Sequence, residues 1–179
     1  SGDFRLINSQ ATNTNTVTMN VDGDIYLLGG ELKLDIGSSS SADATINLKG
    51  DLASDASGLL MNNNSNAQAK FNFIGTGDGL TPATTQTIDV ASTNSDENKY
   101  INFNVKGGAY VQQISRDFEL GRNSELTIED GATYDFGFDG TTALDLKISG
   151  SQTGTGFTSQ QGSTLKITNP NGITKTSGV

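Results

Sequence analysis

Three aspartates in the C-terminal third, Asp135, Asp139 and Asp145, come nearest to a catalytic group by residue type and spacing. Acid and base hydrolysis of a glycosidic bond requires two carboxyl groups at a controlled separation beside a sugar-binding groove. Asp135 alternates with Tyr134 and Phe136, so it faces outward if the two aromatic rings face a core. An acidic side chain on an outer face is more simply a solvent-exposed surface residue, and we favour that interpretation over catalysis.

The segment Asp22-Gly23-Asp24 is the best local candidate for a metal site. Two carboxylates beside a flexible glycine can offer oxygen ligands to calcium, although the full spacing of a calcium-binding loop is missing. A turn that carries solvated acids explains the same residues, and we favour it. We therefore expect no cofactor, with calcium at Asp22 and Asp24 as the alternative.

Aromatic side chains offer a second kind of binding chemistry, because a ring face can stack on a sugar while the hydroxyl group forms a hydrogen bond. The chain has four tyrosines: Tyr26, Tyr100, Tyr110 and Tyr134. The candidates for glycan contact are Tyr110 and Tyr134, together with the neighbouring Asp135 and Asp139. Packing in or near the core is the alternative that we favour, since the chain has no Trp to form a dedicated sugar platform.

Two further polar segments favour structure over binding. The corner Asn62-Asn63-Asn64, with Asn66, could contact a glycan or ice, but asparagines of this kind more often form left-handed turns and side-chain ladders. The segment 75–79 (Gly-Thr-Gly-Asp-Gly) resembles a phosphate loop only superficially, because neither a Lys-Ser/Thr pair nor a helix pattern follows it.

The composition excludes several classes of function. The chain has no Cys and no His, which removes disulfides, thiol nucleophiles and mechanisms that need an imidazole base. Its 11 basic and 20 acidic residues give a formal charge of −9, so nucleic acid, which requires a concentrated basic patch, is an improbable partner. No apolar run approaches the roughly 18 residues of a membrane span, so we expect no membrane insertion.

The candidate site residues described above lie in or beside short runs of alternating apolar and polar residues, and these runs must form the structure that positions them. The clearest runs are 101–105, 110–114, 118–120, 126–128 and 134–138, with onsets roughly eight residues apart and with Gly, Asn or Asp between them. No segment has the length and periodicity of an amphipathic helix. The pattern predicts an all-β chain.

Two architectures fit this pattern, and we expect one domain over residues 1–179. Three strands with their corners would occupy about 22 residues, which predicts about eight stacked coils of a right-handed parallel β-helix, or β-solenoid. An antiparallel β-sandwich or jelly roll also has many short strands. We favour the solenoid because the strands are short, numerous and bordered by glycine.

The sequence also resembles a known group of proteins. The segments that carry the resemblance are 86–88, 101–105, 126–132, 156–158, 162–167 and 170–174. They look like the repetitive regions of very long Bacteroidetes cell-surface proteins, which are adhesin-like and exported by the type IX route. The resemblance covers most of residues 70–179. It implies an extracellular or cell-surface location and a role as part of a larger chain.

We therefore expect a non-catalytic structural or adhesive segment that acts as a spacer rod or presents a binding surface. A carbohydrate-binding module is the alternative, and a polysaccharide-active enzyme is a more remote one. Expected partners are extracellular polysaccharide and the flanking segments of a larger chain. A solenoid with open ends also exposes unpaired strands, so we expect end-to-end association unless polar residues cap the ends.

Overall fold

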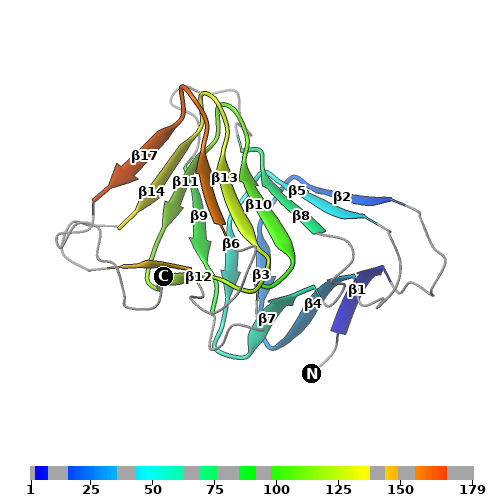
Figure 1. Cartoon of the computed structure of the whole chain (residues 1–179). Coiled ribbons are helices and arrows are strands. Elements are labelled where there is room, and N and C mark those ends of the chain that lie inside the picture. The colour runs from blue at the N-terminus through cyan, green and yellow to red at the C-terminus, as the bar shows by residue number, and fades with distance from the viewer. Residues whose placement is uncertain are drawn as a thin grey trace.

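The structure is a computed structural model that describes residues 3–7, 16–35, 43–62, 69–75, 85–91, 98–137, 144–148 and 156–168. All regular secondary structure in these residues is β-strand, and every strand pair is parallel. The chain is a right-handed parallel β-solenoid (Figure 1). The prediction of an all-β solenoid is confirmed, and the antiparallel sandwich alternative is wrong.

The strands form four sheets. Sheet A contains β1 (Asp3–Ile7), β4 (Gly30–Asp35) and β7 (Gly58–Met61). Sheet B contains β2 (Val17–Val21), β5 (Ala44–Leu48), β8 (Ala69–Phe73), β10 (Ile101–Val105), β13 (Glu125–Ile128) and β16 (Gly156–Ser159). Sheet C contains β3 (Ile25–Leu27), β6 (Leu52–Ser54), β9 (Gln86–Asp89), β11 (Tyr110–Gln113), β14 (Thr133–Phe136) and β17 (Thr164–Ile167). Sheet D contains β12 (Phe118–Leu120) and β15 (Leu146–Ile148).

The chain passes repeatedly from sheet B to sheet C, and then to sheet A in the early coils or to sheet D in the late ones. Stacked asparagines on sheet B lie 27, 25 and 32 residues apart in the sequence. The predicted coil of about 22 residues is therefore too short, and sheets B and C have six described strands each in place of eight. The coils are longer because some corners take many residues, such as the one between β8 and β9.

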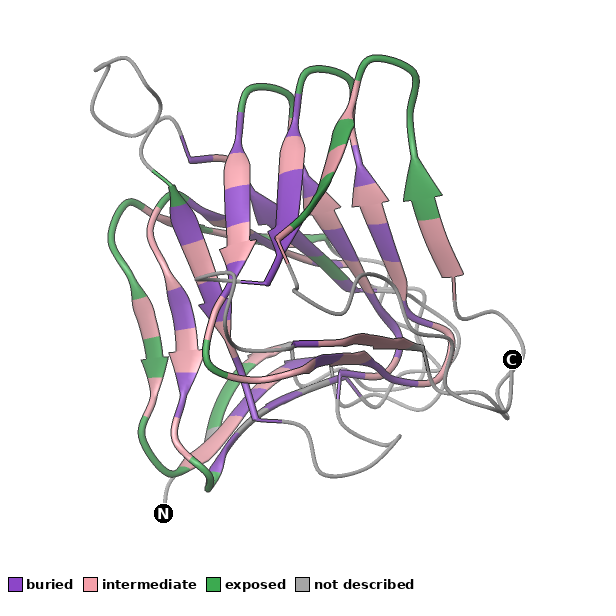
Figure 2. Ribbon diagram, turned by 90° about the vertical axis from the view of Figure 1, so that its left-hand side faces the viewer, coloured by how far each residue is buried: buried purple, intermediate pink, exposed green. Residues whose placement is uncertain are grey.

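The core is built from columns of inward side chains that the strand register places above one another. In sheet B, Ile46, Phe71, Phe103 and Leu126 are direct partners on successive strands, and all four are fully buried. Buried bands alternate with less buried ones along these strands in Figure 2. The Phe103 ring also meets the Phe118 ring of sheet D edge to face, with centroids 5.1 Å apart. Aromatic packing thus connects two faces of the solenoid.

Glycine allows the corner between sheets B and C to stack closely. A Cβ atom at Gly50 would lie 2.5 Å from the carbonyl oxygen of Gly23 in the preceding coil. At the same corner, Gly131 has a φ angle of 74° and donates its N–H to the carbonyl oxygen of Gly162 at 3.2 Å. A side chain would be disfavoured at the first position by space and at the second by backbone conformation.

Asn98 connects the two short sheets, A and D. Its backbone N–H donates to the carbonyl oxygen of Leu60 in β7 at 3.2 Å, and its side-chain Nδ2 donates to that of Glu119 in β12 at 3.1 Å. The residue is fully buried and has a φ angle of 53°, a left-handed conformation that asparagine tolerates. One buried asparagine therefore joins sheet A to sheet D.

We expect Phe103→Ala to lower the free energy of unfolding by about 3–5 kcal/mol, because a large buried ring is removed from the column. Leu28→Ala is the matched control, since Leu28 is 76% exposed and its loss should cost less than about 0.5 kcal/mol. Urea unfolding of the variants measures both values. Equal effects of the two substitutions would contradict the packed interior described above.

Candidate binding surface on sheet C

The outer face of sheet C carries a row of polar side chains that the strand register aligns. Gln112 of β11 pairs with Asp135 of β14, which pairs in turn with Lys166 of β17. Because side chains alternate along a strand, these residues share the outer face and lie opposite the inward Tyr134. The sheet therefore gathers an amide, a carboxylate and an ammonium group from residues more than 50 positions apart in the sequence.

Asp135 is the centre of this cluster. Its carboxylate accepts hydrogen bonds from the Tyr110 hydroxyl at 2.8 Å, the Thr168 hydroxyl at 2.9 Å and the Gln112 amide at 3.3 Å, and it pairs with the Lys166 ammonium at 2.9 Å. The residue has no exposed surface. The predicted outward direction is right, but the expected solvation is wrong, because the long side chains of Tyr110 and Lys166 reach over the carboxylate.

Lys166 and Tyr110 also interact with each other within the cluster. Lys166 Nζ also donates to the Tyr110 hydroxyl at 2.9 Å and lies 5.6 Å from the centre of the Tyr110 ring. These hydrogen bonds, to Tyr110 first and Asp135 second, raise the pKa of Lys166 above its ordinary value. Burial raises the pKa of Tyr110, so its hydroxyl keeps its proton at neutral pH. The cluster presents a charged ammonium, a phenol and amide groups, which suit hydrogen bonding to a polar ligand.

The other tyrosines occupy different environments. Tyr134 lies entirely in the core, where its hydroxyl donates to Gln113 Oε1 at 3.1 Å, so its ring is not accessible to a sugar. Tyr100 is also buried. Tyr26, in contrast, is exposed near the first coil of the described chain, which differs from the expected packing of tyrosines in or near the core. Of the two predicted glycan-contact tyrosines, only Tyr110 lies at the surface.

The Asp22-Gly23-Asp24 corner uses its carboxylates to connect coils. Asp22 forms an ion pair with Lys49 at 2.7 Å, and Asp24 accepts the backbone N–H of Asp51 at 2.8 Å. Both contacts join residues 27 positions apart, from one coil to the next. They agree with the interpretation of this segment as a structural turn, and calcium binding by Asp22 and Asp24 stays a prediction.

The remaining candidates are not brought together. Asp145 precedes β15 of sheet D, whereas Asp135 belongs to sheet C. Asp139, the loop around Pro82, most of the 75–79 glycine segment and the asparagines at 63, 64 and 66 lie outside the described residues. Asn62 is buried, and its Nδ2 donates to the Tyr100 carbonyl oxygen at 2.7 Å, a contact with a distant backbone group that differs from the expected turn or side-chain ladder.

Sequence reasoning missed a second polar pair, formed by Asp89 of sheet C and Arg116 of the bend between β11 and β12. The Arg116 Nε lies 3.5 Å from an Asp89 carboxylate oxygen, and Arg116 also donates to the Ser54 carbonyl oxygen at 2.9 Å. Burial raises the pKa of Asp89, while Arg116 opposes that shift. It also missed Lys166 and Thr168. Their positions on an outer face are visible in the alternation, but their partners depend on the register between distant strands.

Three further findings are absences. The described residues contain no group of three or more acidic, His or Cys side chains placed to hold a metal ion. No helix among them is long and apolar enough to cross a membrane. Comparisons with family models, with curated proteins and with solved structures gave no match.

We expect the stabilising effect of Lys166 to disappear at alkaline pH. The pKa values of Lys166 and Tyr110 are raised above 10.5 and 10.0, so their contribution is full below these values and is lost as the pH rises through the folded-state pKa values. Lys166→Met should lower the free energy of unfolding by about 1 kcal/mol at pH 8, a value that allows for the half-exposed lysine. The difference in unfolding free energy between this variant and the wild type should become smaller as the pH rises above about 10.5.

Urea unfolding at a series of pH values measures this difference. Lys70→Met is the matched control, because Lys70 is an exposed lysine on the outer face of sheet B. A loss for Lys166→Met that matches the control, or that grows with rising pH, would show that the Lys166 cluster does not stabilise the fold.

Proposed function

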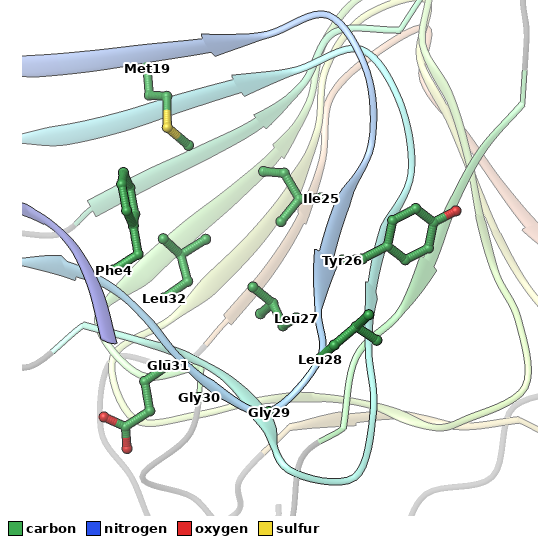
Figure 3. Close-up of a pocket in the computed structure, with 10 residues that line it drawn as sticks. All are labelled: Phe4, Met19, Ile25, Tyr26, Leu27, Leu28, Gly29, Gly30, Glu31 and Leu32. Atoms are coloured by element: carbon green, nitrogen blue, oxygen red, sulfur yellow. The ribbon is translucent and has the colours of Figure 1, made fainter. Parts of the chain in front are cut away.

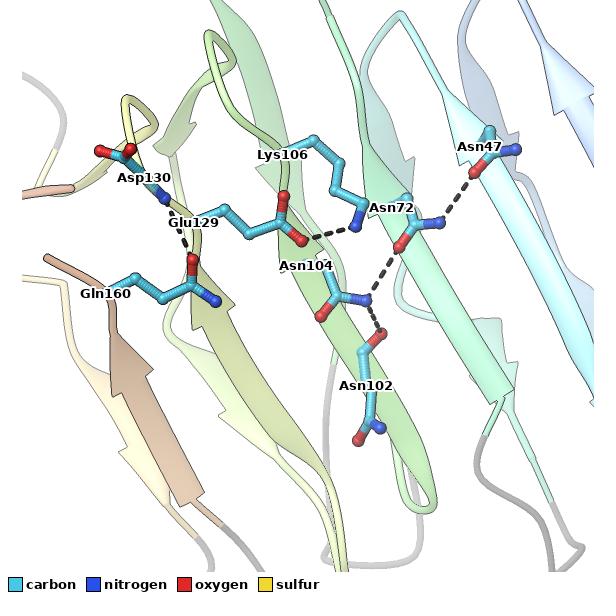
Figure 4. Close-up of polar contacts among 8 residues, drawn as sticks. All are labelled: Asn47, Asn72, Asn102, Asn104, Lys106, Glu129, Asp130 and Gln160. Carbon is cyan, nitrogen blue, oxygen red and sulfur yellow. Dashed lines mark hydrogen bonds and ion pairs between the residues drawn. The ribbon is translucent and has the colours of Figure 1, made fainter. Parts of the chain in front are cut away.

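We propose that this chain is a non-catalytic structural segment of a bacterial surface protein, in which the solenoid acts as a spacer rod. The observation that carries the proposal is an asparagine ladder, defined as Asn20, Asn47, Asn72 and Asn104. The Nδ2 groups of Asn47, Asn72 and Asn104 each donate to the Oδ1 atom of the preceding asparagine, and all three bonds are 2.8 Å long. Figure 4 shows the two bonds that join Asn47, Asn72 and Asn104. The ladder runs along the outer face of sheet B through β2, β5, β8 and β10.

The ladder couples the coils mechanically. All three side-chain bonds point in the same direction, so neighbouring amide dipoles reinforce one another. Stretching the rod along its axis must break these bonds together with the backbone bonds between strands. The asparagines at 47 and 72 use both a donor and an acceptor within the ladder, which leaves less of their capacity for a ligand.

Other side chains connect adjacent coils in the same way. Asp51 accepts the backbone N–H of Thr87 at 2.7 Å, as Asp24 accepts that of Asp51. Lys106 pairs with Glu129 at 2.5 Å, and Gln160 accepts the N–H of Asp130 at 3.3 Å (Figure 4). These polar side chains at the corners therefore connect adjacent coils, as a rod under tension requires.

The location of the protein is part of the same proposal. Its support is the resemblance of residues 70–179 to repetitive regions of Bacteroidetes surface proteins, together with a fold that needs no disulfide. A parallel solenoid is extended by adding coils, so its length can be increased without changing the interactions that hold each coil. This property suits a segment that holds a binding region away from a cell.

We expect Asn72→Asp to lower the free energy of unfolding by about 1–3 kcal/mol, because the carboxylate cannot donate to Asn47 and places two acceptor oxygens together. Asn20→Asp is the matched control. Asn20 is exposed and only accepts from Asn47 within the ladder, so its substitution should cost less than about 0.5 kcal/mol.

Single-molecule stretching from the two chain ends tests the rod directly. The proposal expects extension in several steps as coils detach, with a lower force for Asn72→Asp than for Asn20→Asp. Extension at one low force that neither substitution changes would contradict a mechanical role for the ladder.

A carbohydrate-binding module is the second candidate, and the Tyr110, Asp135 and Lys166 cluster is the observation that favours it. The Lys166 side chain is 48% exposed and lies beside the ring of Tyr110, so the two can offer a cation and an aromatic edge to a sugar acid. Asp135 orients both groups from beneath.

Retention on a panel of bacterial, plant and algal polysaccharides separates the two candidates. The spacer proposal expects no specific retention, with calcium or with a chelator. Retention that falls at least about tenfold in Tyr110→Ala, but not in Tyr26→Ala, would favour the carbohydrate module. Tyr26 is a suitable control because it is an exposed tyrosine of the same sheet at the opposite end of the described strands.

A further inference from the structure

The solenoid has an open, apolar end at its first described coil. A groove of about 270 Å³ there is lined by inward side chains that include Met19, Ile25 and Leu27 (Figure 3). Phe4 and Leu28 line the same groove and are 58% and 76% exposed. Met19, Ile25 and Leu27 have the side-chain directions of a core, and no strand of sheet B or C among the described residues forms a further layer over them.

The opposite end of the described sheets has the matching strands. Strands β2 and β3 form one edge of sheets B and C, and β16 and β17 form the other edge. Every strand pair within these sheets is parallel, so β16 and β17 of one chain can add to β2 and β3 of another without reversing direction. We propose that the occupant of the apolar end is the C-terminal edge of a second copy of this chain, stacked head to tail.

The inward columns continue across this junction. In sheet B the column runs from Met19 through the phenylalanines described above to Phe157, which pairs with Leu126. Stacking a second copy in the same register places Phe157 over Met19. In sheet C the same operation places Ile167, which is 40% exposed, over Ile25. Two apolar pairs therefore form across the junction, while the same register places Val21 opposite the small polar Ser159 and Leu165 opposite Gly23.

The outer rows are complementary in charge as well. In sheet C one row runs through Asp24, Asp51, Thr87, Gln112, Asp135 and Lys166. Its two ends are oppositely charged, so stacking places Lys166 of one copy over Asp24 of the next. Lys166 donates to Tyr110 and Asp135, which leaves the third hydrogen of its ammonium group for this contact.

The asparagine ladder adds a neutral polar pair. Asn104 pairs with Thr127, which pairs with Thr158 at the C-terminal edge. The same stacking therefore places Thr158 over Asn20, the first residue of the ladder. At the adjoining corner, Gln160 comes over Asp22, which can accept from the glutamine amide. The head-to-tail register pairs no like charges along these rows.

Such a contact joins two different surfaces and does not close on itself, so it extends into linear assemblies. The inference rests on the register and side chains of the two edges, and it concerns the isolated chain. Failure of head-to-tail stacking would leave the spacer proposal intact, because stretching tests contacts within one chain.

Sedimentation of the purified chain over a range of concentrations tests the association. We expect the average mass to rise continuously with concentration. Asp24→Asn should weaken the association about two- to fivefold through loss of the ion pair with Lys166. Glu119→Gln is the matched control, since it removes one negative charge from β12 of sheet D, away from the edge strands of sheets B and C, and should have no effect. A mass that stays that of a monomer at all concentrations would overturn the proposal.

Cysteine cross-linking tests the register itself, because the chain has no cysteine of its own. Partner Cα atoms in adjacent strands lie about 4.8 Å apart, which is within the range for a disulfide. A mixture of Asn20→Cys and Thr158→Cys chains should form the mixed disulfide under mild oxidation. Lys70→Cys replaces Asn20→Cys as the control, since Lys70 is exposed in the middle of sheet B. Equal cross-linking with the control, or a preference for Asn20→Cys pairing with itself, would overturn the register.

Discussion

In-register parallel pairing between coils is the constraint on which the rest of this structure depends. Once Phe103 lies beside Phe71 on the neighbouring strand, every other residue of those strands has a fixed partner and a fixed face. The apolar columns, the asparagine ladder and the Asp135 cluster are consequences of that one alignment. A shift by one residue would exchange the inner and outer faces and destroy all three.

Stacking in register favours some residue types and penalises others. Phenylalanine and asparagine can stack on their own kind, because rings pack together and an amide carries both a donor and an acceptor. Carboxylates cannot, and the row that contains Asp24 and Asp51 shows how the chain avoids repulsion: each carboxylate accepts a backbone N–H from the following coil. Asp135, a fully buried member of the same row, instead forms an ion pair with an ammonium group and accepts hydrogen bonds from two hydroxyl groups.

The sequence was sufficient to predict what depends on neighbouring residues, and insufficient for what depends on pairing. Alternation around Tyr134 and Asp135 predicts their opposite directions correctly, because it is a property of one strand. The burial of Asp135 depends in part on Lys166, which lies on the adjacent strand but is 31 positions away in the sequence. Likewise, the ladder partners are separated by 25 to 32 residues, and no fixed repeat length in the sequence reveals them.

The proposed contact between chains uses the same kinds of interaction that hold the coils together, because β16 and β17 continue the register of the inner strands. Covalent connection keeps successive coils at a high effective concentration, commonly in the millimolar range for short linkers. Two separate chains lack this advantage. The proposed contact between Lys166 and Asp24 therefore forms only when the concentration of the protein is high enough. Both the strength of the ladder within one chain and the tendency of the chain ends to associate therefore depend on the strand register. Substitutions at the end strands alone can change the association and leave the ladder intact.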